Sequence, residues 1–167
     1  AIEAEMELMA PLRGLADFIV NTSQLNVHEL SARIKEIISM EDKARDMHIE
    51  VSSFAFKRGL PLESDIVIDV RFLPNPYFVP GLKEKTGMDP EVKEYLSSFD
   101  TYVNFVGKLK DFIGFILPLC KREGRSYLHI AIGCTGGRHR SVAVAEEVRQ
   151  AIEAAGFSSR IKHRDVA

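Results

Sequence analysis

The sequence lacks tryptophan and holds only two cysteines, Cys120 and Cys134, in 167 residues. Two cysteines are too few for a disulfide scaffold and fit a reducing compartment. No apolar run approaches the roughly 18 residues that a membrane span requires, and no secretory leader opens the sequence. We therefore expect a cytoplasmic protein with no membrane partner.

A strong charge of one sign is also missing, because the net charge is only −2. The charges are nevertheless spread unevenly. Residues 1–119 carry 13 Lys and Arg against 19 Asp and Glu, a net charge of −6, whereas residues 120–167 carry 9 against 5, a net charge of +4. The basic last third favours an anionic partner on that side, although an ordinary solvated surface explains the charge equally well.

The remaining composition, 46% hydrophobic and 28% charged, is that of a soluble globular protein. Buried strands are predicted at 48–56, 65–72 and 127–133, and a basic strand at 158–164. Helices are predicted at 101–122 and after the loop that follows residue 133, the second ending at Gly156. Because helices separate most of these strands, we expect an α/β fold with a mainly parallel sheet and helices on both faces.

One helix carries a long apolar stripe that should face the core. The stripe of the 101–122 helix comprises Tyr102, Phe105, Leu109, Phe112, Ile116 and Leu119.

The first 40 residues form a separate piece in this interpretation. A helix over 2–13, a short strand over 16–23 and a helix after Asn26 are predicted, with Glu29 three positions later as in a capping box. One strand does not make a sheet, so we expect residues 1–40 to be the remnant of another α/β domain and the chain to be a piece of a longer protein. The charged segment 39–46 is predicted to link it to a second domain, 41–167.

The most informative stretch is HIAIGCTGGRHRSVAVAEEV, residues 129–148. Two glycines let the backbone turn sharply with its N–H groups inward, and the following helix adds unpaired donors and a partial positive charge. Ligands bind at the carboxyl ends of parallel strands. The loop therefore predicts a phosphate or sulfate site, with a tight solvated turn as the alternative. Its expected ligand residues are Thr135, Gly136, Gly137, Arg138, His139, Arg140 and Ser141.

The pattern Cys134-x-x-Gly137-x-x-Arg140-Ser141 also fits the loop of cysteine-dependent phosphatases, in which a thiolate attacks phosphorus. Gly133 stands where those enzymes usually carry histidine, and the candidate acid Asp69 lies inside a predicted strand. Catalysis by Cys134 and Arg140 is therefore the alternative to simple binding. It predicts rapid alkylation of Cys134 and loss of turnover in a Cys134→Ser variant.

No G-x-x-x-x-G-K-[ST] motif occurs, which excludes ATP hydrolysis by that route in these residues. We expect no cofactor and no metal in this chain, and no catalytic residue if the loop only binds.

Several segments together resemble one family. SFAFKRGLP, DVRFLPNPY, TGMD and IGCTGGRHRSVAVAE, in this order, are similar to the C-terminal domain of the RapZ/YvcJ family, the RNase adapter and nucleotide-binding proteins of bacteria. PLRGLADFIVNTSQLNVHEL resembles the end of that family's N-terminal P-loop kinase-like domain. The resemblance spans nearly the whole chain and implies that the ATP- or GTP-binding part, with weak hydrolysis, lies upstream.

The resemblance also implies ligands and partners. The domain would sense a phosphorylated amino sugar, glucosamine-6-phosphate, form homo-oligomers, and bind small RNA and a ribonuclease. Arg71, Asn75 and Tyr77 would form a wall facing the ligand loop. Basic side chains near the C-terminal end would contact RNA mainly through phosphates, namely Lys121, Arg122, Arg125, Arg160, Lys162, His163 and Arg164. A terminal strand at an oligomer interface is the alternative for these residues.

The sequence thus predicts a regulatory binding module. Arg140 and His139 should pair with the phosphate, so Arg140→Ala should weaken anion binding by about 1–3 kcal/mol. Besides the phosphatase, one alternative is an oligomerisation domain, which predicts a stable oligomer with no saturable ligand.

Overall fold

The computed structural model describes residues 19–41 and 47–166. The chain divides into two units, Ala1–Arg45 and Asp46–Ala167. In the first unit, helix α2 spans Val27–Glu41. The helix predicted over 2–13 and the first residues of the strand predicted over 16–23 lie outside the described residues.

The predicted capping box of α2 is confirmed. Asn26 Oδ1 accepts hydrogen bonds from the N–H groups of His28 and Glu29, and the Glu29 carboxylate accepts one from the Asn26 N–H, all at 2.9 Å. Each partner satisfies amides that the helix start would leave without an acceptor.

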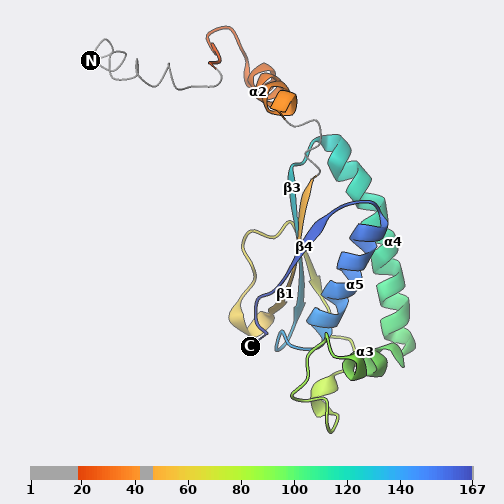
Figure 1. The fold of residues 1–167 in the computed structure, drawn as a ribbon. Coiled ribbons are helices and arrows are strands. Elements are labelled where there is room, and N and C mark those ends of the chain that lie inside the picture. The colour runs from red at the N-terminus through yellow and green to blue at the C-terminus, as the bar shows by residue number, and fades with distance from the viewer. Residues whose placement is uncertain (1–18, 42–46, 167) are drawn as a thin grey trace. The chain divides into compact units, whose positions relative to one another are not determined.

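The second unit is built on a four-stranded parallel sheet with strand order β2-β3-β1-β4 (Figure 1). The strands are β1 (His48–Ala55), β2 (Ile66–Asp69), β3 (Tyr127–Cys134) and β4 (Ser159–His163). The prediction of an α/β fold with a mainly parallel sheet is confirmed. The edge strand β2 is shorter than the predicted 65–72, because the chain turns away after Asp69.

Three α-helices belong to this unit: α3 (Pro90–Ser97), α4 (Asp100–Glu123) and α5 (Arg140–Ala154). The two long ones, α4 and α5, lie on the same face of the sheet (Figure 1). Both crossovers, β2 to β3 and β3 to β4, move in the same direction across the sheet, and right-handed crossovers then share a face. The expectation of helices on both faces is wrong for residues 47–166, because their β1–β2 connection contains a 3-10 turn, η1 (Phe56–Arg58), in place of an α-helix.

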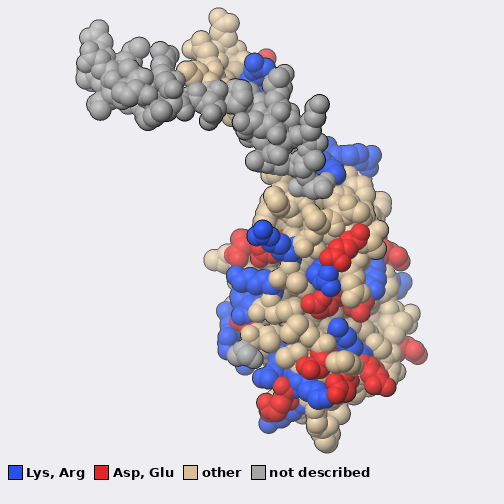
Figure 2. Space-filling view, in the orientation of Figure 1, with Lys and Arg blue, Asp and Glu red and all other residues tan. Residues whose placement is uncertain are grey.

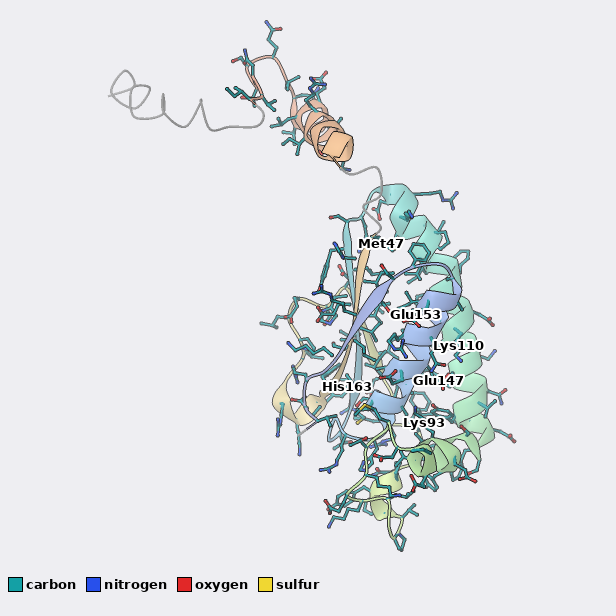
Figure 3. The ribbon with its side chains drawn as sticks, viewed as in Figure 1. Met47, Lys93, Lys110, Glu147, Glu153 and His163 are labelled. Carbon is teal, nitrogen blue, oxygen red and sulfur yellow. The ribbon has the colours of Figure 1, made fainter. Side chains whose placement is uncertain are left out.

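The core lies between the sheet and these helices. Along α4 the fully or nearly buried positions are Tyr102, Val106, Leu109, Ile113 and Leu117. The predicted stripe is therefore wrong in part. Phe112 and Leu119 are 45% and 40% exposed, since α4 has more apolar positions than one face can bury. Lys110 of α4 pairs with Glu147 of α5 at 2.5 Å and links the two helices at their surface (Figure 3).

The parallel register brings three strand ends to one edge of the sheet. Ala55 at the end of β1 is paired with Cys134 at the end of β3, and Asp69 at the end of β2 is paired with Gly133. The segments that follow these strands therefore meet there. They include η1, a second 3-10 turn η2 (Pro76–Phe78), and the loop that leads into α5.

Candidate functional site

A pocket of about 630 Å³ opens at this carboxyl edge of the sheet. Segments that are distant in sequence line it: η1, η2 with Asn75, residues 83–84, the loop 134–140, and Asp165, which follows β4. Of the ligand residues expected from the sequence, Asn75, Tyr77, Thr135, Gly136, Arg138, His139 and Arg140 line this pocket.

Three expected residues lie outside the lining. Gly137 and Ser141 belong to the loop but contact the Cys134 sulfur. The Gly137 N–H donates to Sγ at 3.2 Å, and the Ser141 hydroxyl lies 3.1 Å from it. The Arg71 guanidinium pairs with Asp69 at 2.6 Å. It also lies over the ring of Phe56, 4.1 Å from its centroid.

The loop has the geometry of an anion-binding turn. Gly137 takes a φ of +72°, which an L side chain rarely adopts, and a Cβ there would stand 3.0 Å from the Ala55 nitrogen. The first helical hydrogen bond of α5 runs from the Ala143 N–H to the His139 carbonyl. The amides of the first turn therefore have no acceptor within the helix, and they lie beside a pocket that carries positive charge.

The basic side chains of the loop also hold the opposite wall in place. Arg138 donates to the backbone carbonyl oxygens of Glu84 at 2.6 Å and Lys85 at 3.1 Å. The His139 ring donates from Nε2 to the Leu82 carbonyl at 3.0 Å. Arg138 and His139 thus hold residues 82–85 against the loop through hydrogen bonds.

Arg140 likewise holds a neighbouring segment in place, and it also carries a charge at the pocket. Its Nη1 donates to the carbonyl oxygens of Arg71 at 2.6 Å and Leu73 at 3.1 Å, and its Nη2 lies 3.4 Å from the Thr135 hydroxyl. Only 6% of Arg140 is exposed. Its guanidinium therefore fixes the segment after β2, and its charge remains at the pocket.

The pKa of His139 lies below its ordinary value of 6.5. Burial is the main cause and outweighs the carbonyls of Leu82 and Lys83, which favour the charged ring; Arg138 and Arg140 lower the pKa further. The ring is therefore neutral at pH 7. It contributes a hydrogen-bond donor to the Leu82 carbonyl but no charge for a phosphate.

This shift predicts a loss of stability in weak acid. As the pH falls from 7 to 5, His139 of the unfolded chain takes up a proton near pH 6.5, while the folded ring resists it, so the free energy of unfolding must fall. His139→Gln keeps an N–H donor and cannot titrate in this range. Urea unfolding at pH 7, 6 and 5 should show a smaller loss in this variant, and equal losses in both proteins would contradict the assignment.

The structure adds pocket residues that the sequence interpretation missed, namely Lys57, Arg58, Phe78, Lys83, Glu84 and Asp165. Cys134, expected there only as the nucleophile of the alternative phosphatase, also lines the pocket. Lys57 and Arg58 could have been found, because they directly follow the carboxyl end of a predicted parallel strand. Phe78, Lys83 and Glu84 carried no such signal, since their position depends on how the long 73–89 segment folds back. The position of Asp165 depends on the pairing of β4 with β1.

Asp165 is the least expected of these residues. Its side chain is 4% exposed and accepts hydrogen bonds from the Ala55 N–H at 2.6 Å and from Arg164, and it pairs with Arg58 at 3.4 Å. Burial opposes its ionisation, but the hydrogen bonds from Arg164 and Ala55 outweigh that effect and lower the pKa of Asp165. The ionised carboxylate therefore ties the end of β4 to the end of β1 at the base of the pocket.

The expected RNA-contact residues fall into two groups. Lys121 and Arg122 lie in the last turn of α4, toward the edge of the sheet opposite to the pocket. Arg125 follows the helix there and pairs with Asp65 and Glu123. Lys121 also lies over the ring of Phe157, 5.4 Å from its centroid.

The second group follows β4. Arg160 and Lys162 alternate with Ile161, which packs against the core, so their side chains leave from the other face. Figure 2 shows Lys and Arg side chains gathered along the margin where β4 runs to the C-terminus. His163 points the opposite way, between the Ser53 hydroxyl at 2.9 Å and the Glu146 carboxylate at 3.2 Å (Figure 3). Arg164 donates to the Gly59 carbonyl at 2.8 Å.

Two further properties concern the part of the chain that the structure describes. No three histidine, cysteine, aspartate or glutamate side chains in it come together in a way that could hold a metal ion. Within residues 19–41 and 47–166, no helix has the length and apolar content needed to cross a membrane.

The fold and site define an α/β domain with a cationic pocket at the carboxyl edge of a parallel sheet. Residues 47–167 match the family described as the RapZ C-terminal domain. The chain belongs to this family, as the motifs in the sequence predict.

Curated relatives agree with this assignment. A "Nucleotide-binding protein" of Geotalea daltonii is 47% identical over 165 residues, which cover 99% of this chain and 58% of that protein. One of Caldicellulosiruptor bescii is 48% identical over 99% of this chain and 57% of its own length, and one of Solibacter usitatus is 43% identical over 99% and 52%. The chain thus spans little more than half the length of the curated relatives it matches.

Proposed function

We propose that the second unit binds a phosphorylated amino sugar, glucosamine-6-phosphate or a close analogue, in the pocket beside the 134–141 loop. The observation that carries this proposal is the charge of the lining. Lys57, Arg58 and Lys83 join the loop at one pocket, so cationic side chains surround the amides of a helix N-terminus.

The lining residues suggest separate roles. The backbone N–H of Gly136, the Thr135 hydroxyl and the Arg140 guanidinium would bind the phosphate, with Lys57 adding charge. A carboxylate is also needed for the ammonium group of an amino sugar, and Glu84 lines the same pocket. His139 would position the loop rather than neutralise the phosphate, because its ring is neutral and donates to Leu82.

Occupancy of the pocket would control binding of small RNA or a protein partner across the basic face of β4. Gly137 of the loop packs so closely on Asp165 that a Cβ would stand 2.9 Å from the Asp165 Cβ, and Asp165 is bound by Arg164 at the end of β4. A shift of the loop would therefore move Asp165 and Arg164, and with them the end of the strand that carries Arg160 and Lys162. A switch of this kind requires that the ligand binds the RNA-competent and RNA-incompetent states with different affinity.

The rest of the parent protein would supply the nucleotide chemistry. The relatives are named nucleotide-binding proteins, and the matched part covers only 57–58% of their length. We infer that ATP or GTP binds in the upstream part, that residues 1–40 are the end of a P-loop kinase-like domain, that the protein acts in the cytoplasm as an adapter for a ribonuclease, and that it assembles as a homo-oligomer.

A cysteine-dependent phosphatase is the second candidate. The hydrogen bond from the Gly137 N–H to the Cys134 sulfur favours it, because such donors stabilise a thiolate. The leaving group, however, needs a protonated acid. Hydrogen bonding to Arg71 lowers the pKa of Asp69, so this carboxyl is ionised at neutral pH. Binding without turnover is therefore the proposal that the geometry supports better.

Calorimetric titration with glucosamine-6-phosphate, fructose-6-phosphate and inorganic phosphate tests the binding proposal. Lys57 lies at the pocket and is exposed, so Lys57→Ala removes charge without disturbing the core. We expect a rise in Kd of about fivefold for all three ligands at low salt, the size of one partly solvated ionic contact. The matched control is Lys108→Ala on the exposed side of α4, which should leave the Kd unchanged.

Two outcomes would overturn the proposal. Absence of saturable heat with every ligand would leave the loop as a structural turn and favour the oligomerisation domain. Equal weakening by Lys57→Ala and Lys108→Ala would mean that the ligands respond to overall charge rather than to the pocket.

A further inference from the structure

Two aromatic side chains of the pocket wall are unusually exposed. Phe78 is 79% exposed and Tyr77 is 48% exposed, although both line the pocket. Burial of a phenylalanine side chain stabilises a fold, and Phe78 gives up most of that stabilisation because its ring stays in solvent. The exposed ring therefore has no evident purpose in the fold.

The backbone beneath these rings is firmly held. Asn75 Oδ1 accepts a hydrogen bond from the Tyr77 N–H at 3.3 Å, the Val79 N–H donates to the Pro76 carbonyl at 3.0 Å, and Pro76 is buried. The rings therefore project from a fixed turn, η2, and are not the tip of a loose loop.

The rings also have a defined mutual arrangement. Tyr77 and Phe78 meet edge to face, with centroids 5.5 Å apart and planes at 87°. The Lys83 ammonium lies 5.1 Å from the Tyr77 centroid, so Tyr77 already has a cation over its ring. Phe78 is the more exposed of the two rings and has the larger surface left to offer to a ligand.

We propose that Phe78 is a specificity-determining residue that packs against the ring of the bound phosphate ester. The inference rests on the proposed function, since it requires a phosphate at the 134–141 loop. With the phosphate held there, the remainder of a ring-bearing ester lies within the same pocket as Phe78, while Glu84 and Asn75 offer polar groups to its substituents. Inorganic phosphate and short open-chain esters gain nothing from this wall.

The test compares the ratio of two affinities. Kd values for glucosamine-6-phosphate, glycerol 3-phosphate and inorganic phosphate are measured by calorimetry for the wild-type protein and for Phe78→Ala. We expect the preference for the ring-bearing ester over inorganic phosphate to fall by roughly tenfold in Phe78→Ala, the effect of burying one face of an aromatic ring. Phe78→Tyr retains a ring and should restore the preference.

The control is Phe115→Ala, which removes another exposed phenylalanine, 69% exposed on α4 and outside the pocket lining. It should leave all three Kd values unchanged. An unaltered preference in Phe78→Ala, or equal weakening of all three ligands, would overturn the role of Phe78 while leaving the phosphate site standing. Absence of saturable binding by the wild-type protein would instead overturn the proposed function, and the inference with it.

Discussion

Gly87→Ala should lower the free energy of unfolding by about 3 kcal/mol. An ideal Cβ at this position would stand 2.2 Å from the His139 carbonyl oxygen and 2.4 Å from the Ala143 nitrogen. Both are backbone atoms at the start of α5, so no side-chain rotation can make room. The Gly87 N–H also donates to the Arg138 carbonyl at 2.9 Å, and moving the segment away would break this bond.

Urea unfolding followed by circular dichroism measures this effect. The matched control is Gly114→Ala, a glycine in α4 with nothing within 4 Å of an added Cβ. Alanine favours a helix over glycine by about 0.8–1.0 kcal/mol, so this variant should be more stable than the wild-type protein. A Gly87→Ala protein as stable as the wild type would mean that the close approach of residue 87 to α5 is not required.

Arg140→Ala should damage both stability and binding. Removal of the side chain leaves the carbonyls of Arg71 and Leu73 without their donor, and Leu73 is 3% exposed. We expect the free energy of unfolding to fall by about 2–3 kcal/mol, the cost of buried groups that lose a charged partner. The affinity for glucosamine-6-phosphate should fall by about tenfold or more, because the guanidinium also faces the loop.

Stability is measured by urea unfolding, and binding by calorimetry at a temperature where circular dichroism shows the variant folded. Arg122→Ala, at the exposed end of α4, is the control for loss of one arginine. Lost binding with unchanged stability would contradict the role of Arg140 in holding the segment after β2. Lost stability with unchanged affinity in the folded variant would contradict its role in binding the phosphate.

Local chemistry explains which parts of the fold can be predicted from the sequence. Asn26 and Glu29 form their capping box because the partners are three residues apart. The strands β1, β3 and β4 appear within one residue of their predicted bounds, since runs of apolar or alternating residues specify them. The glycine-containing loop also lies at a strand end before a helix, as its sequence predicts.

One prediction failed because it depends on a distant partner. The apolar stripe predicted for α4 is displaced, since the 3.6-residue period allows two overlapping faces and packing against α5 selects one. For His163 the alternation along β4 sets the face from which its side chain leaves. Its partners there, Ser53 and Glu146, come from β1 and α5 and depend on the tertiary structure.

The sequence by itself determined the strands β1, β3 and β4, the loop that follows β3 and the family to which the chain belongs, because all three rest on residues that are close together in the chain. Only the tertiary structure decided what completes the pocket. Strand order and parallel register bring Lys57, Lys83 and Asp165 to one edge. The same arrangement directs the loop's basic side chains to carbonyls of residues 71–85, because a buried charged donor must bond to whichever acceptor the fold places within reach.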